Sequence, residues 1–466
     1  MKDEHSKVNF TIMIKIIKTI RTILVRVIDN TILVLILPFC LVGLLCATPW
    51  IFKQRRIWEN SAKRNRKVLF IQPFSIQKLD SQGYENILPF RNPSMKWIGL
   101  LDPANSQDAN IRVADNFELI AWKSPKIVEF LEKLKFLTTC IFLREFISIF
   151  KITCYCNKEQ IGILRAYKHN YPALRAYLVS SFIKIPYIVD ISGNYELKRR
   201  LIGRVMYFRK LNRLPIVKIF SARLTNWLLG LPLRHACHVF GRNKCCYEHA
   251  FALGTPVDRL SVLRINNFNA AFNFYNPEKP PAKPAEYPYM LFVGRLSELK
   301  FPLDVLDAFN LAAPHLPEYR LVLIGDGAIR PDVEERKERS EYRDRIVLLG
   351  ACSSDIVLTW TAHATISICP LSGSVLAESM LCGIPVIAYD VAGHGEIVID
   401  DYTGFLVPFR NIAVLADKMI TVARNYEEAK IVAMRGRELA RVAFNKEKIL
   451  DKENMIYRQA LTDSQN

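Results

Sequence analysis

The sequence lacks several patterns that define well-known classes of binding protein. Its eleven cysteines include no CxxC pair matched by a second one, so we expect neither a zinc site nor a disulfide framework, and we expect a reducing compartment. It contains no RNP-like pattern, no zinc-finger spacing and no basic helix followed by a zipper, which argues against a nucleic-acid partner. No EF-hand loop and no DxD at a strand end is present, so no metal requirement is implied.

Acidic residues are outnumbered by basic ones. The chain of 466 residues has 64 lysines and arginines against 45 aspartates and glutamates, a formal net charge of +19. This excess favours anionic partners such as a membrane surface or phosphorylated ligands. The hydrophobic content of 50% is sufficient for two globular domains.

The most informative segment is Leu371–Ala388. Gly373 and Ser374 supply small backbone at what we predict to be the start of a helix, whose free N–H groups and positive dipole end suit a diphosphate. Glu378 lies one turn further in, where a carboxylate can accept hydrogen bonds from sugar hydroxyls. The segment therefore indicates a sugar-nucleotide pocket. The alternative is an ordinary αβ unit in which Glu378 is solvated surface.

Two cations and several glycine turns precede this segment. An apolar strand over 291–293 ends in glycine and is followed by Arg295 and Lys300. Arginine can hold phosphate oxygens bidentately, and lysine adds a mobile point charge. Two further apolar strands, over 321–324 and 346–349, end in turns that contain Gly325, Gly327 and Gly350.

In this order and spacing the segments resemble the donor-binding half of GT-B glycosyltransferases, specifically the retaining family 4 group (glycosyl transferases group 1), from about Tyr287 to Val422. The resemblance implies that Arg295 and Lys300 bind the donor diphosphate and stabilise its charge as it leaves. It also implies that Glu378 contacts the nucleotide ribose.

By the same resemblance, Gly373 and Ser374 approach phosphate or sugar, Gly325 and Gly327 shape the nucleotide loop, and Gly350 shapes the base pocket. The nucleotide-sugar is a substrate, and no cofactor is expected.

The chain departs from the family pattern at three places. Pro370 stands where the first of the two motif glutamates belongs, and Ser192 and its neighbours replace a histidine that follows the strand over 186–191. The double-glycine loop after the first strand is missing. In a retaining front-side mechanism the donor phosphate can itself accept the acceptor proton, so no dedicated base is required.

The amino terminus predicts a membrane anchor. Residues 31–52 carry no charge and are long enough to cross a bilayer as a helix. A buried or monotopic hairpin is the alternative. Residues 1–30 form a basic amphipathic segment of the kind that lies in the interface. Basic residues on both flanks leave the orientation open, but a need for cytosolic sugar nucleotides favours a single-pass protein of the cytoplasmic membrane with a cytosolic catalytic part.

Alternating strands and helices from residue 67 onward predict an α/β fold. We expect a doubly wound, Rossmann-like acceptor-side domain over 67–275, a proline-rich linker over 276–288 and a nucleotide-sugar-binding domain over 289–426. The resemblance implies that 427–466 forms a helix that crosses back onto the first domain. Together these segments predict a GT-B architecture of two Rossmann-like domains that face a cleft.

Ligands of such sheets bind beyond the carboxyl ends of the strands. In the first domain this nominates five residues that follow or end two predicted strands: Arg165, Tyr167, Asp190, Ser192 and Asn194. The basic and apolar run over 197–234 has the pattern of a segment that docks on anionic lipid. A solvated helix face that packs on the sheet is the alternative for this run.

The sequence thus predicts a membrane-anchored glycosyltransferase that uses a UDP- or GDP-sugar. The expected acceptor is a lipid-linked or glycan precursor of a surface polysaccharide or glycolipid. One alternative is a catalytically inactive GT-B scaffold in a membrane glycan-assembly complex. Another is a sugar-nucleotide epimerase of the same fold.

Overall fold

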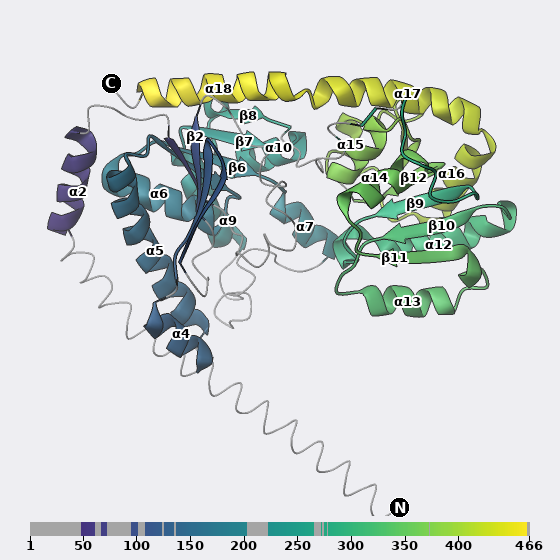
Figure 1. Ribbon diagram of the computed structural model, residues 1–466, viewed down its shortest axis with the longest axis horizontal. Coiled ribbons are helices and arrows are strands. Elements are labelled where there is room, and N and C mark those ends of the chain that lie inside the picture. The colour runs from purple at the N-terminus through teal and green to yellow at the C-terminus, as the bar shows by residue number, and fades with distance from the viewer. Residues whose placement is uncertain are drawn as a thin grey trace, which may run out of the picture.

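The protein consists of two α/β units, each built on one mainly or wholly parallel sheet (Figure 1). The structure is a computed structural model. It describes residues 48–60, 67–71, 95–100, 108–123, 125–134, 137–202, 222–264, 272, 275–276, 278–371 and 373–463.

The first sheet has eight strands in the order β3-β4-β2-β1-β5-β6-β7-β8, and every neighbouring pair is parallel except β3 and β4. The central strands are buried along almost their whole length and are mainly apolar, as is typical of parallel strands covered on both faces. The strands are β1 (Lys67–Ile71), β2 (Lys96–Leu100), β3 (Ala109–Ala114), β4 (Phe117–Ala121), β5 (Ile163–Tyr167), β6 (Tyr187–Ile191), β7 (His238–Gly241) and β8 (Leu260–Val262).

One face of this sheet is covered by helices that bury Leu69, Leu164, Val189 and their neighbours. The helices of the first unit are α2 (Thr48–Asn60), α4 (Lys126–Lys133), α5 (Leu137–Glu159), α6 (Tyr171–Ile183), α7 (Tyr195–Ile202), α9 (Ala222–His235) and α10 (Lys244–Ala252), with the short η3 (Val257–Arg259). Helix α2 belongs to this layer, because Trp58 lies in the core and its Nε1 donates to the Ile161 carbonyl at 3.4 Å.

The predicted membrane span over 31–52 lies outside the described residues except for its last five, which begin α2. Within the described part of the chain, no helix combines the length and the apolar character that crossing a bilayer demands.

The second sheet has six parallel strands in the order β11-β10-β9-β12-β13-β14. They are β9 (Tyr289–Val293), β10 (Arg320–Ile324), β11 (Ile346–Gly350), β12 (Ile366–Cys369), β13 (Val386–Tyr389) and β14 (Phe405–Val407). The helices of this unit are α12 (Pro302–Ala312), α13 (Arg330–Glu338), α14 (Ser354–Ala362), α15 (Ser374–Leu381), α16 (Ile412–Arg424) and α17 (Tyr426–Ala443), with the short η4 (Glu298–Lys300), η5 (Ala313–His315), η6 (Arg343–Arg345) and η7 (His394–Glu396).

Helix α17 is followed by α18 (Lys446–Asp463), and together they run along both units, α17 on the second and α18 on the first (Figure 1). Helix α18 covers the face of the first sheet that the other helices leave free, with Tyr457 and Ala460 packed against Val68, Phe70 and Trp97. The far end of the chain is therefore part of the core of the first unit.

The attachment of α18 is ionic as well as apolar. The guanidinium of Arg165, in the middle of β5, donates to both carboxylate oxygens of Asp190 at 2.8 and 3.0 Å, to Glu453 and to the Tyr457 hydroxyl at 2.6 Å. Arg165 is 0% exposed and Glu453 1%. The prediction that Arg165 and Asp190 line the ligand edge of the sheet is wrong, because both side chains point into the face that α18 covers.

Candidate functional site

The loops at the carboxyl ends of β9, β10 and β11 contact each other through their backbones. Gly294 N donates to Ile324 O at 2.9 Å, Leu296 N to Asp326 O at 3.0 Å and Gly325 N to Gly350 O at 2.7 Å. These hydrogen bonds fix the loop that carries Arg295 and Lys300 against the loop after β10.

Glycine is required where these loops touch. Gly325 has φ +141°, and a Cβ added there would lie 1.9 Å from the Gly294 carbonyl oxygen. A Cβ at Gly327 would lie 2.1 Å from the Leu296 oxygen, and Gly350 adopts φ +73°. Gly325 and Gly327 thus hold the loop that carries Arg295 in place.

We predict that alanine is destabilising at one of the glycines and nearly neutral at another. Gly325→Ala forces the loops apart and should destabilise the second unit by about 2 kcal/mol or more, because the left-handed backbone and the steric overlap act together. Gly373→Ala meets no atom within 4 Å and should change the free energy of unfolding by less than about 0.5 kcal/mol. Urea denaturation of both variants measures the difference; equal stability would refute this explanation of the loop packing.

Lys300 lies at the end of η4 and contacts the segment before α15. Its Nζ donates to the Leu371 carbonyl at 2.6 Å. Burial, together with the nearby charges of Lys198 and Arg295, lowers the pKa of Lys300 to about 8. Arg295 is exposed and has no ion-pair partner among the described residues. The site therefore holds two cations that no described carboxylate neutralises. Their positive charge is available to bind an anion.

The first turn of α15 lies next to these cations. Gly373 occupies the N-cap position, and Ser374 begins the helix. The Lys300 ammonium is hydrogen-bonded to Leu371, which precedes the N-cap residue Gly373 by two residues in the chain. Free amides and a positive dipole end at this position add to the attraction for an anion. The structure thus brings together Arg295, Lys300, Gly373 and Ser374, which are far apart in the sequence.

Glu378 is in the second turn of α15 and is 6% exposed. Burial, with a contribution from the Glu378 charge, raises the pKa of the Cys369 and Cys382 thiols that lie near it. Both cysteines are buried structural residues. The alternative that places Glu378 on a solvated surface is therefore wrong, and the carboxylate lies close to the end of β12.

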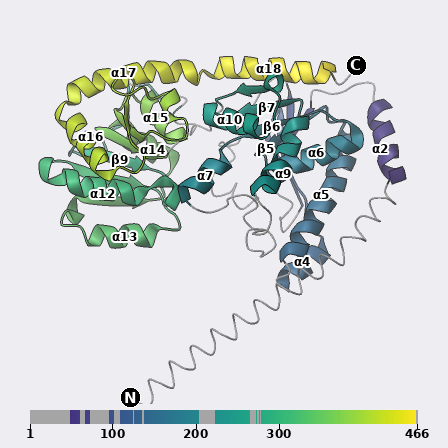
Figure 2. The ribbon, with the colours of Figure 1, turned by 180° about the vertical axis from the view of Figure 1, so that it is seen from behind.

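The first unit faces this site through the loop and helix after β6. Ser192 follows β6 directly, and the Asn194 side chain accepts from Leu197 N at 2.9 Å at the start of α7. Helix α7 packs beside η4 and lies between the two sheets in both views (Figures 1 and 2). Ser192 is therefore on the side of the first unit that faces the second.

Direct hydrogen bonds join the two units beside α10. The Glu396 carboxylate accepts from Lys244 N at 2.6 Å and from Arg264 at 2.8 Å, and Asn243 donates to the Ala392 carbonyl at 3.1 Å. Sequence reasoning missed this contact, because nothing in either segment indicates which partner it meets.

His169 is a second feature that the sequence analysis did not single out. It is 1% exposed, its ring centroid is 4.6 Å from that of Tyr195 and 5.2 Å from that of His249, and neither ring nitrogen has a hydrogen-bond partner among the described residues. Burial holds the pKa of His169 well below its usual range. His169 is thus a neutral core residue behind Tyr195.

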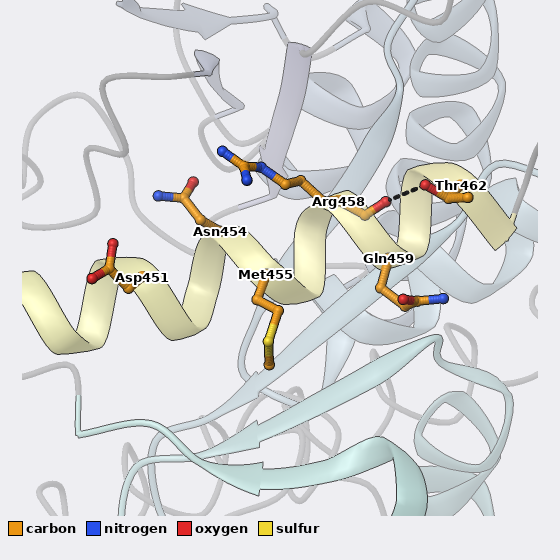
Figure 3. A pocket seen from close by; sticks show the side chains of 6 residues that line it. All are labelled: Asp451, Asn454, Met455, Arg458, Gln459 and Thr462. Atoms are coloured by element: carbon orange, nitrogen blue, oxygen red, sulfur yellow. Dashed lines mark hydrogen bonds between the residues drawn. The ribbon is translucent and has the colours of Figure 1, made fainter.

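A separate hollow lies on the outer side of α18 (Figure 3). The side chains that line it all come from that helix: Asp451, Asn454, Met455, Arg458, Gln459 and Thr462. Thr462 uses its hydroxyl to donate to the Arg458 carbonyl at 2.9 Å. With walls from one helix alone among the described residues, the hollow has no convergent groups for catalysis. The described residues also contain no cluster of side chains suited to a metal ion.

Residues 276–439 match the family model Glycosyl transferases group 1. The N-acetyl-alpha-D-glucosaminyl L-malate synthase of Bacillus anthracis is 26% identical over 38% of this chain and 47% of its own length. The gpi3 subunit of the phosphatidylinositol N-acetylglucosaminyltransferase of Schizosaccharomyces pombe is 29% identical over 45% of each chain. The matched segment thus spans about half the length of these curated relatives.

The fold of most of the chain is shared with a solved structure. Anabaena HepE, in complex with UDP and glucose, superimposes with a TM-score of 0.59 and 15% identity over 84% of this chain and 98% of its own. At this identity the likeness concerns the fold alone. The second unit holds most of the segment that matches Glycosyl transferases group 1, and with the first unit it forms a GT-B-like fold of two Rossmann-like sheets.

Proposed function

We propose that the protein is a glycosyltransferase that moves a sugar from a UDP- or GDP-sugar to a lipid-linked or glycan acceptor, with retention of configuration. The observation that carries the proposal is the convergence of Arg295, Lys300 and the N-terminus of α15 in a segment that matches this family. These groups present positive charge at one place, where a diphosphate fits.

Each of the site residues has a role that follows from its side-chain chemistry. Arg295 and Lys300 bind the donor diphosphate and stabilise the negative charge that grows on it as the sugar bond breaks. The Glu378 carboxylate accepts hydrogen bonds from ribose hydroxyls. An oxygen of the departing phosphate takes the proton of the attacking acceptor hydroxyl, so that attack and departure occur on the same face of the sugar.

The acceptor is proposed from different observations. One relative is named for transfer to phosphatidylinositol, and the uncharged run over 31–52 of this chain is suited to a membrane anchor. An anchor in the cytoplasmic membrane would hold the site near lipid-linked acceptors and in contact with cytosolic nucleotide-sugars. The basic run after Leu197 would add attraction to anionic lipid.

Calorimetric titration with UDP and GDP tests the donor site. The chain should begin at Thr48, the start of α2, because this keeps the whole helix that places Trp58 in the core. We expect micromolar binding of one nucleotide, weakened about 10- to 100-fold by Arg295→Ala, since a hydrogen bond to a charged group contributes about 1.5–3 kcal/mol. Glu378→Ala should also weaken binding.

Arg336→Ala is the matched control, because Arg336 pairs with Asp307 on the surface of the same domain. Its affinity should equal that of the wild type. A folded protein that binds neither nucleotide would refute the donor site.

An inactive scaffold is the second candidate, and Pro370 is the observation that favours it. This buried proline directly follows β12, where the resemblance implies a carboxylate for the transferred sugar. A scaffold would bind nucleotide without turnover, whereas an enzyme releases UDP or GDP from a donor when acceptor is present.

A further inference from the structure

The first unit places a cation of its own beside the proposed donor site. Lys198 is on α7, the helix that packs against η4, and its charge lowers the pKa of Lys300. A Cβ added at Gly193 would lie 2.4 Å from Lys198 Nζ, and the same nitrogen is 5.3 Å from the ring centroid of Tyr195. The ammonium therefore lies over the backbone that follows β6, at the ligand edge of the first sheet.

Lys198 differs from its neighbours on α7 in having no carboxylate partner among the described residues. Arg199 and Arg200 both pair with Glu196, at 2.5 and 3.4 Å. Arg199 and Arg200 therefore fit the solvated helix face that is one interpretation of the basic run over 197–234. Lys198 belongs instead to the contact between the two units.

A second cation of the first unit lies close to Lys198. Burial lowers the pKa of Lys198, and the charge of Arg242 contributes to the same shift. The Arg242 guanidinium donates to the Tyr167 hydroxyl at 2.9 Å, and its Cζ lies 5.0 Å from the centroid of that ring. Arg242, like Lys198, has no carboxylate partner among the described residues. Cations crowded at a partly desolvated place cost folding free energy unless an anion binds there. Such an arrangement is typical of a functional site.

We propose that Lys198, supported by Arg242, forms a phosphate subsite that the first unit contributes opposite Lys300, so that the bound phosphate contacts both units. The proposal rests on the proposed function for the identity of its ligand. The ligand chemistry is a phosphate oxyanion, which belongs either to the donor diphosphate or to a phosphorylated acceptor. Bound there, the anion would neutralise cations of both units at once.

The experiment measures two affinities of the full-length, detergent-solubilised protein by calorimetry. The first is for UDP and GDP, and the second is for inorganic pyrophosphate on protein saturated with the nucleotide that binds, or on free protein if neither does. The variants are Lys198→Met, the charge-preserving Lys198→Arg, and Lys430→Met as an exposed control on α17. Thermal unfolding confirms that each variant is folded.

A loss of at least tenfold in nucleotide affinity in Lys198→Met, largely restored in Lys198→Arg, would identify the donor diphosphate as the ligand. Unchanged nucleotide affinity with loss of pyrophosphate binding would identify an acceptor phosphate. Unchanged affinity for both ligands would overturn the subsite. If the wild type binds pyrophosphate but neither nucleotide, the proposed function fails, and the effect of Lys198→Met on pyrophosphate still decides the subsite; binding of neither ligand would overturn both.

A pH profile separates a charge effect from a loss of structure. Because the Lys198 charge lowers the pKa of Lys300, Lys198→Met should raise the pH at which phosphate affinity falls. A variant that merely perturbed the packing of α7 would lower affinity without moving that pH.

Discussion

Replacing Arg165 by methionine should lower the free energy of unfolding of the first unit by about 3–5 kcal/mol, the cost of leaving buried charges without their partner. Asp190 and Glu453 would face each other in a core from which water is excluded. Burial already raises the pKa of Glu453, and the charge of Arg165 opposes that rise. The variant should therefore also release α18 more readily to proteases.

Urea denaturation followed by tryptophan fluorescence measures this effect, since Arg165 lies 5.7 Å from the ring of Trp97. Arg336→Met is the control, and it should cost less than about 1 kcal/mol because its ion pair is exposed. Neutralising the carboxylates as well, with Asp190→Asn and Glu453→Gln, should recover part of the lost stability. If Arg165→Met were as stable as Arg336→Met, the ionic attachment of α18 would be disproved.

Replacing Lys300 by methionine should reduce turnover by about 10²- to 10³-fold, the usual effect of removing one group that stabilises a developing anion. The thermal midpoint should not fall. Burial lowers the pKa of Lys300 to about 8 from the ordinary 10.5, so at neutral pH the unfolded chain holds this proton more tightly and the charge costs folding free energy. The cost is present below pH 8 and disappears as the pH rises toward 10.5.

Deprotonation of Lys300 should also be visible in the nucleotide affinity of the wild type. A bound diphosphate raises the pKa of Lys300, so the affinity contributed by the ammonium is complete below pH 8 and is lost as the pH rises above it. Titrations with the bound nucleotide between pH 7 and 10 measure this loss, with Lys430→Met as the control. A pH-independent affinity, or a Lys300→Met variant with normal turnover, would exclude Lys300 from the site.

The second unit could be predicted from sequence because its signals are local. Apolar runs such as Leu321–Ile324 end at glycines, and the small residues before Glu378 mark the start of α15. Spacing in the chain therefore gave the order of strands and loops. It did not give the backbone contact between Gly325 and Gly294, which depends on how neighbouring strands pair.

The first unit was harder to predict for physical reasons. In β5 every residue is buried, so the alternation that tells the two faces of a strand apart is absent, and Arg165 was placed on the wrong side. Strands β2 to β4 were not recognised from the sequence. Lys198 resembles its basic neighbours in sequence, and only the packing of α7 on η4 distinguishes it.

Nucleotide release from a panel of UDP- and GDP-sugars decides whether the protein is a glycosyltransferase. The full-length protein serves as catalyst, and a membrane lipid extract is the source of acceptor. We predict that one donor is turned over, that release requires the extract, and that Lys300→Met abolishes nearly all of it. Nucleotide binding without turnover of any donor would contradict the assignment as an enzyme and favour the inactive scaffold.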